Sequence, residues 1–424
     1  MKNALIVGVL LLTTGAFIDL VVDESINMNT MPDGDMHAQI MWGVIDLVVI
    51  LACIFHGRQL VRVALRQPYI LAFVAWATLS VFWSENPSLT ARRVLGIICT
   101  TALGFLLGMR FQTKELFRLL AWALVIGMVA TVVAGALFPS FGVMANLDGG
   151  AWRGVFNHKN DLGSKMGIAI LVFTCLLWES RRNRMIYAAL LLLAVAVIVL
   201  SRSMTSIIVT VLTLSFGIYR RMRFRPAEKV VFAALGPLVA LAAVFFLQGR
   251  TDQIFALIGR DSSLTGRVPL WQLSFAAVFQ RPLLGAGWDA FWPGKGGDTI
   301  RSLIGWGAPH AHNGFLEIAL NIGLVGLIIF MVFNYDCFRR AARYSKMQGQ
   351  PLRLWPLLFY TYTFLFFFME APPIDRHTIM FVLFCALSVS MTEALALEPV
   401  PQELEVENLP AGIAADSAMA QEFR

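Results

Sequence analysis

Apolar runs recur along the chain from end to end, separated by short polar segments that contain turn-forming and charged residues. A helix needs about 20 apolar residues to cross a hydrocarbon core of about 30 Å. The runs predict about twelve spanning helices, near 3–22, 39–56, 69–83, 94–109, 119–138, 162–178, 185–201, 205–219, 230–247, 314–334, 354–370 and 378–395. Because lipid offers the backbone no hydrogen-bond partners, the predicted fold class is an all-α integral membrane protein.

The pattern changes at both ends of this predicted membrane domain, which covers residues 1–395. The start, Met1–Phe17, resembles a signal peptide, but the apolar run continues through Ile18–Val22 without a small-residue cleavage site. This predicts a retained first helix. Residues 396–424 are acidic, contain prolines and lose the apolar period. They predict a disordered cytoplasmic tail.

Composition supports the membrane assignment and narrows the classes of partner. The chain is 58% hydrophobic and 14% charged, whereas a soluble domain carries about 25% charged residues. Its net charge of +7 does not indicate a nucleic-acid partner, because the basic residues lie in short clusters between apolar runs. The five cysteines form no CxxC pair, so neither a disulfide framework nor a zinc site is predicted.

Every second connection between the predicted spans is basic. The first intervening connection instead carries four acidic residues, Asp23, Glu24, Asp33 and Asp35, and no Lys or Arg. The positive-inside rule therefore predicts a multi-pass protein with both termini in the cytoplasm. The basic residues are Arg58, Arg62 and Arg66; Arg110, Lys114 and Arg118; Arg181, Arg182 and Arg184; Arg220, Arg221, Arg223, Arg225 and Lys229; and Arg339, Arg340, Arg343, Lys346 and Arg353.

Arginines also occur in the connections predicted to face outward, against the orientation signal. A cation placed there suggests an anionic ligand, and the planar guanidinium is suited to bidentate phosphate binding. The alternative for any one of them is pairing with an acid or a lipid phosphate, or interfacial snorkelling. These residues are Arg92, Arg93, Arg153, Arg202, Arg250, Arg260, Arg267, Arg281, Arg301 and Arg376.

The longest outward connection, 248–313, is too long for a passive turn. It contains Pro269–Gln280, which is apolar but too short to span and predicts a helix at the membrane surface. The connection ends with His310 and His312, and a neutral imidazole is a suitable general base for a sugar hydroxyl. Solvated or capping histidines are the plainer alternative, and a two-histidine metal site lacks a clear third ligand.

Two further outer segments combine donors with tight turns. The first, Arg153–Gly163, packs several donors and one acid before the sixth predicted span. The second, Ser201–Ser206, is so short that it fixes Arg202 at a helix boundary. A fixed guanidinium can be preorganised for negative charge.

At these residues the sequence resembles the superfamily of O-antigen ligases, O-antigen polymerases and exopolysaccharide polymerases. The resemblance covers most of the chain and rests on the order and loop placement of several pieces together. The pieces are Trp83–Ser88 with Arg92, Arg153–Gly163, Ser201–Ser203, Thr265–Arg267 with Trp271, and His312–Leu316.

The resemblance implies a membrane glycosyltransferase of the GT-C-like type that uses no metal or nucleotide cofactor. It implies transfer of a glycan from undecaprenyl diphosphate to an acceptor hydroxyl at the periplasmic face, with inversion. The catalytic positions that match are His312 as base, with Arg267 and Arg202 on the diphosphate. The substrate-binding candidates are Arg92, Arg153, His158, Lys159, Asn160, Trp271, His310 and Asn313.

Three functions remain open at this point. A ligase, which we favour, uses lipid A core as the acceptor, whereas a polymerase uses a second lipid-linked glycan. The segment Asn157–Asn160 resembles exopolysaccharide polymerases in particular. A polysaccharide transporter or flippase would need ionisable residues midway along its spans, where only Asp46 and Asp19 qualify. A structural scaffold would have no need of the outer arginines.

Overall fold

A computed structural model of the chain describes residues 2–18, 36–144, 150–221, 267–347, 351–370 and 375–397, with the isolated positions 225, 228, 236 and 238. Within them, six helices are long and apolar enough to cross a membrane, and further apolar helices are shorter. The predicted class, an all-α integral membrane protein, is confirmed. One antiparallel pair of short strands, β1 (Val143–Met144) and β2 (Ala151–Trp152), was not predicted.

Every predicted span except 230–247 overlaps a described helix, although the helix in the first span, 3–22, ends at Thr13 and residues 19–22 lie outside the described residues. The predicted span 230–247, the connection 248–266 and the tail 398–424 lie outside the described residues, apart from positions 236 and 238. The long helices are α2 (Met36–Leu65), α4 (Pro87–Arg110), α5 (Thr113–Leu137), α7 (Lys159–Glu179), α14 (Gly314–Tyr344) and α16 (Ile379–Ala396). The others are α1 (Lys2–Thr13), α3 (Pro68–Leu79), η2 (Ser80–Trp83), α6 (Pro139–Gly142), α8 (Arg184–Leu200), α9 (Met204–Arg221), α12 (Arg267–Val278), α13 (Lys295–Ile304), η4 (Pro351–Leu354) and α15 (Trp355–Phe367).

Glycines let α4 and α16 pack closely at the centre of the bundle. A Cβ atom added at Gly104 would meet Cys385 and the carbonyl oxygen of Val382, and one added at Gly108 would meet Ala386. Small residues at such contacts allow helix backbones in a membrane to approach and gain van der Waals contact. By contrast, α2 lies at the edge of the bundle, with 6% of its most apolar window buried.

A polar contact within α2 holds this helix to the bundle. Asp46 of α2 lies 3.0 Å from Nε2 of His377, which precedes α16. The His377 ring stacks on Trp42 with ring centroids 4.3 Å apart. Asp46, one of two acids that a transport pathway would have used, therefore has a structural partner. The other, Asp19, lies outside the described residues.

A kink in α14 docks an outer segment onto the bundle. At Gly323 the backbone takes φ of 70°, which interrupts the helix. Carbonyl groups released near the kink accept hydrogen bonds from another segment, since Leu320 receives the Ala286 N–H at 2.9 Å and Asn321 receives the Gly287 N–H at 2.8 Å. Glycine at 323 suits this conformation because it has no Cβ to clash at positive φ.

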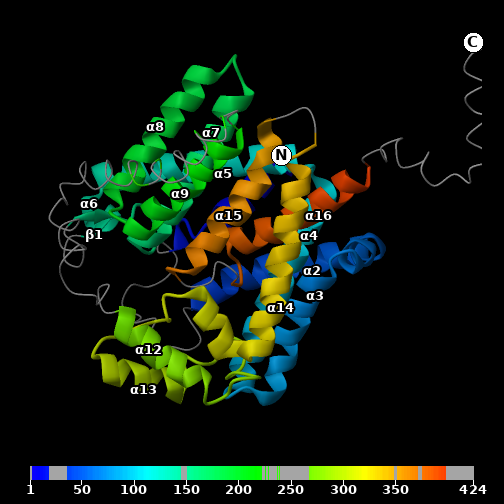
Figure 1. Cartoon of the computed structure of the whole chain (residues 1–424), viewed down its shortest axis with the longest axis vertical. Helices are drawn as coiled ribbons and strands as arrows, with labels where there is room; N and C mark the ends of the chain where they lie inside the picture. The colour runs from blue at the N-terminus through cyan, green and yellow to red at the C-terminus, as the bar shows by residue number, and fades with distance from the viewer. Residues whose placement is uncertain are drawn as a thin grey trace, which may run out of the picture.

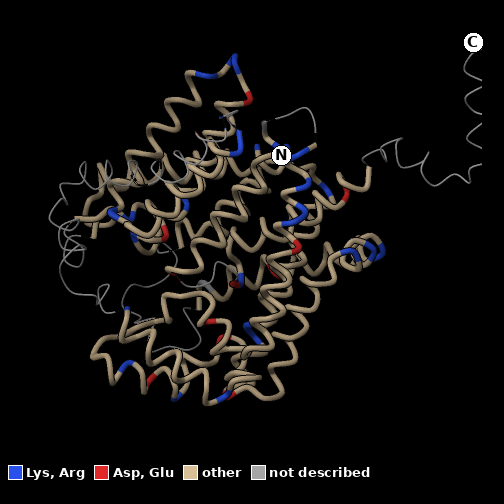
Figure 2. Tube along the Cα trace, viewed as in Figure 1, with Lys and Arg blue, Asp and Glu red and all other residues tan. Residues whose placement is uncertain are grey.

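Helices α12 and α13 form a small layer beside the start of α14. Figure 1 shows α12 and α13 together at one end, away from α7, α8 and α9. The surface helix predicted at 269–280 corresponds to α12. In Figure 2, Lys and Arg lie mainly at helix ends and in the connections between helices, as expected for spans in lipid.

Candidate active site

The loop that carries both predicted histidines runs from α13 to α14 and is shaped by capping residues at each end. Gly305, with φ of 76°, ends α13 in the left-handed conformation that glycine tolerates. Asn313 begins α14, and its side-chain oxygen accepts the N–H groups of Phe315 and Leu316 at 3.1 Å each. Asn313, a predicted substrate-binding residue, therefore has a capping role in this structure.

Three side chains hold the middle of this loop through Ala311. Trp271 of α12 donates its Nε1–H to the Ala311 carbonyl at 2.9 Å. The N–H of Ala311 donates to the carboxyl group of Glu317, which also accepts from Nε1 of Trp292 at 2.7 Å. Glu317 is buried. The turn between His310 and His312 is thus fixed from both sides, and the indole N–H of Trp271 is used for that purpose.

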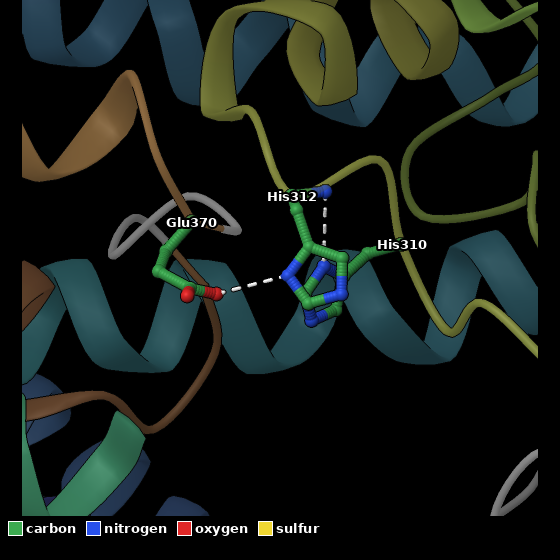
Figure 3. Close-up of side chains that lie close together, drawn as sticks. All are labelled: His310, His312 and Glu370. Atoms are coloured by element: carbon green, nitrogen blue, oxygen red, sulfur yellow. Dashed lines mark hydrogen bonds and ion pairs between the residues drawn. The ribbon is translucent and has the colours of Figure 1, made fainter. Parts of the chain in front are cut away.

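A buried carboxyl group, Glu370, joins several predicted site residues. Its oxygens accept from Nδ1 of His312 at 3.1 Å, from Nη2 of Arg267 at 3.0 Å and from Nδ2 of Asn160 at 2.8 Å. Arg267 also donates through Nη1 to the carbonyl of Met369 at 2.7 Å. Figure 3 shows the His312 ring directed at Glu370, with the His310 ring beside it.

The environment of Glu370 keeps it ionised. Burial by itself raises the pKa of Glu370, but the hydrogen bond with His312 and the positive charge of Arg267 outweigh burial, so its pKa lies below the usual range. An ionised carboxylate only accepts hydrogen bonds, so Nδ1 of His312 must carry the proton. In the neutral ring, Nε2 then keeps its lone pair and can accept a proton from a substrate.

His310 has the opposite arrangement. Its Nδ1 accepts the backbone N–H of His312 at 3.2 Å, so in the neutral ring the proton is on Nε2. Burial, followed by the neighbouring His312, lowers the pKa of His310 to about 3. The two rings lie with centroids 4.1 Å apart. At neutral pH His310 is therefore a neutral donor, whereas the neutral form of His312 would offer Nε2 as the acceptor nitrogen.

The turn with Arg202 is connected to the same carboxylate through two side chains. Ser203 donates its hydroxyl to Oδ1 of Asn160 at 2.9 Å, and Asn160 in turn donates to Glu370. Arg202 itself is exposed. Both Arg202, at φ of 52°, and His312, at φ of 50°, adopt left-handed backbone conformations. Non-glycine residues rarely do so, and such strain concentrates at functional sites.

The start of α7 lies close to the histidines. His158 caps this helix by accepting the N–H of Asn160 on Nδ1 at 3.2 Å, and it lies near enough to His310 to act on it electrostatically. Lys159 is the first residue of α7. The predicted segment Arg153–Gly163 therefore reaches the cluster through His158 and Asn160.

Two other predicted arginines are not donors to Glu370. Arg153 donates its Nε–H to the carbonyl of Phe141 at 2.8 Å, and its guanidinium lies 5.3 Å from the centre of that ring. Arg92 lies near the start of α4, next to Arg93, which forms an ion pair with Asp289 at 2.9 Å. Arg153 therefore lies beside α6, and the neighbour of Arg92 is tied to Asp289.

Glu370 could serve as the third ligand of a metal site with His310 and His312, a ligand that could not be identified from the sequence. Ligand atoms of His310, His312 and Glu370 lie within 4.8 Å of one another. Arg267, however, places a positive charge 3.0 Å from the same carboxylate, which opposes binding of a cation. The absence of a metal cofactor stays a prediction, which an EDTA experiment can test.

Glu370 is the functional residue that sequence reasoning missed. It closes the predicted span 354–370 and stands directly before Ala371, Pro372 and Pro373. A carboxylate at the outer end of an aromatic run was the available signal, because such a group needs a buried partner. Nothing in that pattern named His312 as the partner.

The fold and this cluster define a polytopic membrane protein with a carboxylate–histidine pair flanked by arginines at one end of its helices. Residues 188–331 match the family model described as O-antigen ligase, and this range includes Arg202, Arg267, His310 and His312. The chain is also 32% identical over 283 residues to the "Exopolysaccharide production protein ExoQ" of Rhizobium meliloti (strain 1021), covering 64% of this chain and 64% of that protein's length. The two matches confirm the predicted relationship to the superfamily of O-antigen ligases, O-antigen polymerases and exopolysaccharide polymerases.

Proposed function

We propose that this protein is a glycosyltransferase that transfers a glycan from undecaprenyl diphosphate to an acceptor hydroxyl. The observation that carries the proposal is the contact between Nδ1 of His312 and the ionised Glu370, 3.1 Å apart. A carboxylate behind an imidazole fixes the tautomer and stabilises the imidazolium that forms when the ring accepts a proton. This arrangement suits a general base, and the outer arginines beside it would have no use in a scaffold.

The proposed reaction uses these groups as follows. Nε2 of His312 takes the proton from the acceptor hydroxyl while the hydroxyl oxygen attacks the anomeric carbon of the donor. The bond from that carbon to the diphosphate oxygen breaks, and the electron pair leaves with undecaprenyl diphosphate, inverting the anomeric centre. The diphosphate carries its negative charge away and needs no proton. General base catalysis of this kind contributes about 10² to 10⁴ in rate.

Arg267 and Arg202 are proposed to hold the diphosphate. Arg267 uses Nη1 and Nη2 on Met369 and Glu370, so its guanidinium is held in a fixed orientation, with Nε still available to an anion. Arg202 is exposed on the turn that is linked to Asn160. Each charge-assisted bond to a phosphate oxygen contributes about 1.5 to 3 kcal/mol. The start of α7, at His158 and Lys159, adds the positive end of a helix dipole.

Two acceptors agree with the comparisons. The match to the O-antigen ligase model favours lipid A core as the acceptor, as the sequence analysis did, whereas the relative named for exopolysaccharide production favours a second lipid-linked glycan. A strain that lacks the gene for this protein distinguishes the two acceptors. Loss of the lipopolysaccharide ladder with accumulation of lipid-linked polymer indicates ligation, and accumulation of lipid-linked single repeats indicates polymerisation.

We further propose that the protein lies in the bacterial inner membrane with both termini in the cytoplasm and the Glu370 cluster on the periplasmic side. The alternating basic connections support this orientation. The transporter alternative is weakened because Asp46, its candidate ionisable group within a span, is paired with His377.

The test of the general base uses two neighbouring histidines. Purified enzyme is reconstituted with donor and acceptor, and transfer by wild type, His312→Ala and His310→Ala is compared. We expect His312→Ala to abolish transfer while donor binding is retained, and His310→Ala to lose much less, because the acceptor nitrogen of His310 faces the loop backbone. Near-normal turnover by His312→Ala would show that His312 is not the general base. Loss of wild-type activity in EDTA, restored by zinc, would show that the reaction depends on a metal ion.

A further inference from the structure

Trp306 is a large aromatic side chain beside His312 that the proposed mechanism leaves unused. Its ring centroid lies 6.1 Å from that of His312, with the two planes tilted by 39°. It stands directly after Gly305, where the chain turns out of α13, and 39% of the residue is exposed. An exposed indole next to a proposed catalytic base is therefore accessible to substrate.

Other tryptophans on this side of the protein have bonded N–H groups. Nε1 of Trp76 donates to the carbonyl of Ile322, Nε1 of Trp83 to that of Leu284, and Nε1 of Trp271 to that of Ala311. Within the described residues the Trp306 indole makes no hydrogen bond of this kind; its backbone carbonyl accepts the Ala308 N–H at 2.9 Å, and its ring contacts that of His312. Trp288 also lacks a partner for Nε1 among these residues, but it is buried in the core, whereas Trp306 is partly exposed.

The loop does not depend on Trp306 for its shape. Arg301 of α13 donates through Nη2 to the carbonyl of Trp292 at 2.7 Å and through Nη1 to that of Ala308 at 3.3 Å. Ala308 and Ala311 are fully buried. These anchors lie on both sides of the exposed indole, so the ring is presented from a segment that is already fixed.

We propose that the exposed face of Trp306 binds the acceptor sugar. The proposal rests on the proposed function and adds the subsite that positions the attacking hydroxyl. The C–H groups on one face of a pyranose are weakly positive, and they stack on the negative face of an aromatic ring. A ring that stacks on Trp306 would bring its hydroxyl groups within reach of His312.

We assign the acceptor sugar to Trp306, and not the donor sugar, because of how the His312 ring is oriented. Nδ1 of His312 faces Glu370, to which Arg267 is also bonded, so the charged side of the cluster suits the diphosphate. The proton is accepted on the opposite nitrogen, Nε2, and Trp306 belongs to the same loop as His312. Stacking on Trp306 is made equally in the bound complex and in the transition state, so its loss should raise the acceptor KM and leave kcat nearly unchanged.

The experiment measures KM for each substrate separately in reconstituted enzyme. In Trp306→Ala we expect KM for the acceptor to rise about tenfold, equivalent to about 1.4 kcal/mol, with the donor KM unchanged and kcat within about twofold of wild type. Trp306→Phe, which keeps an aromatic face, should recover most of this loss. Trp122→Ala is the matched control, because this tryptophan is 63% exposed but lies on the span α5. An unchanged acceptor KM in Trp306→Ala, or a rise confined to the donor KM, overturns the proposal.

A binding measurement separates this inference from the proposed function. Core oligosaccharide released from lipopolysaccharide and repeat oligosaccharide released from the lipid carrier are titrated separately into wild type, Trp306→Ala and Trp306→Phe. We expect one of the two glycans to bind wild type and to lose about tenfold in affinity in Trp306→Ala. If the wild type binds this glycan but transfers nothing, the proposed function fails and the subsite stands. If neither glycan binds wild type, or both bind Trp306→Ala as tightly as wild type, the subsite is refuted.

Discussion

Replacing Glu370 by glutamine removes one negative charge from the cluster and keeps nearly the same shape. The native carboxylate accepts three side-chain hydrogen bonds, from His312, Arg267 and Asn160, and its side chain is 8% exposed. In the reaction His312 becomes an imidazolium 3.1 Å from this carboxylate. A glutamine amide cannot neutralise that charge, and it also permits the wrong tautomer of the ring.

The size of the effect follows from the geometry. An ion pair at about 4 Å gains about 4 kcal/mol at the effective dielectric constant of about 20 that suits protein sites. A loss of about 3 to 5 kcal/mol from the transition state reduces kcat by about 10² to 10⁴. We therefore expect Glu370→Gln to lower kcat by this factor, with a smaller change in donor KM, since the guanidinium of Arg267 keeps its bond to Met369.

The assay is glycan transfer by purified, reconstituted enzyme with thermal unfolding measured on the same preparations. Glu85→Gln is the matched control, because Glu85 also pairs with an arginine, Arg281 at 3.4 Å, but has no contact with His312. It should keep near-normal kcat. Turnover by Glu370→Gln within about threefold of wild type would show that His312 needs no carboxylate. The proposed role of Glu370 in stabilising the His312 imidazolium would then be refuted.

Three further predictions concern the ligand, the orientation and pH. Arg202→Lys and Arg267→Lys should each still impair transfer, because lysine keeps the charge but loses the planar fork; full activity in both variants at normal protein levels would reduce these residues to topology or packing. A cysteine introduced at Asp298 should react with a membrane-impermeant maleimide from outside and one at Ser345 should not; labelling of Asp298 from the inside alone would reverse the proposed orientation. Burial lowers the pKa of His310 from 6.5 to about 3, so the unfolded chain binds a proton in this range that the folded protein does not. Folding stability should fall as pH is lowered from about 6.5 toward about 3, and His310→Gln should flatten this slope in thermal unfolding curves; an unchanged slope would show that His310 is not held neutral.

The helices of this protein were readable from the sequence because the bilayer imposes a length and polarity on each span. The run 314–334 marked the start of α14 well, since Asn313 and Gly314 provide a local capping signal. Its continuation to Tyr344 and its break at Gly323 were not readable. The break is stabilised by hydrogen bonds from Ala286 and Gly287, and such contacts leave no local pattern.

The candidate site divides in the same way. The outer arginines and the two histidines stood out in the sequence because cations against the orientation signal and paired histidines are unusual. The choice of Arg202, Arg267 and His312 among them came from the family resemblance, because Arg267 and Arg153 differ by their tertiary contacts and not by their local sequence.

By itself the sequence determined the membrane class, the positions of most spans and the chemical types available at the outer face, since each depends on residues close together in the chain. Only the tertiary structure decided that Glu370 orients His312 and that Trp306 stands exposed beside it. Glu370 is separated in sequence by 58 residues from His312, by 103 from Arg267 and by 210 from Asn160. Helical periodicity carries no information across such separations, and the packing of the helices alone brings these groups within hydrogen-bond distance.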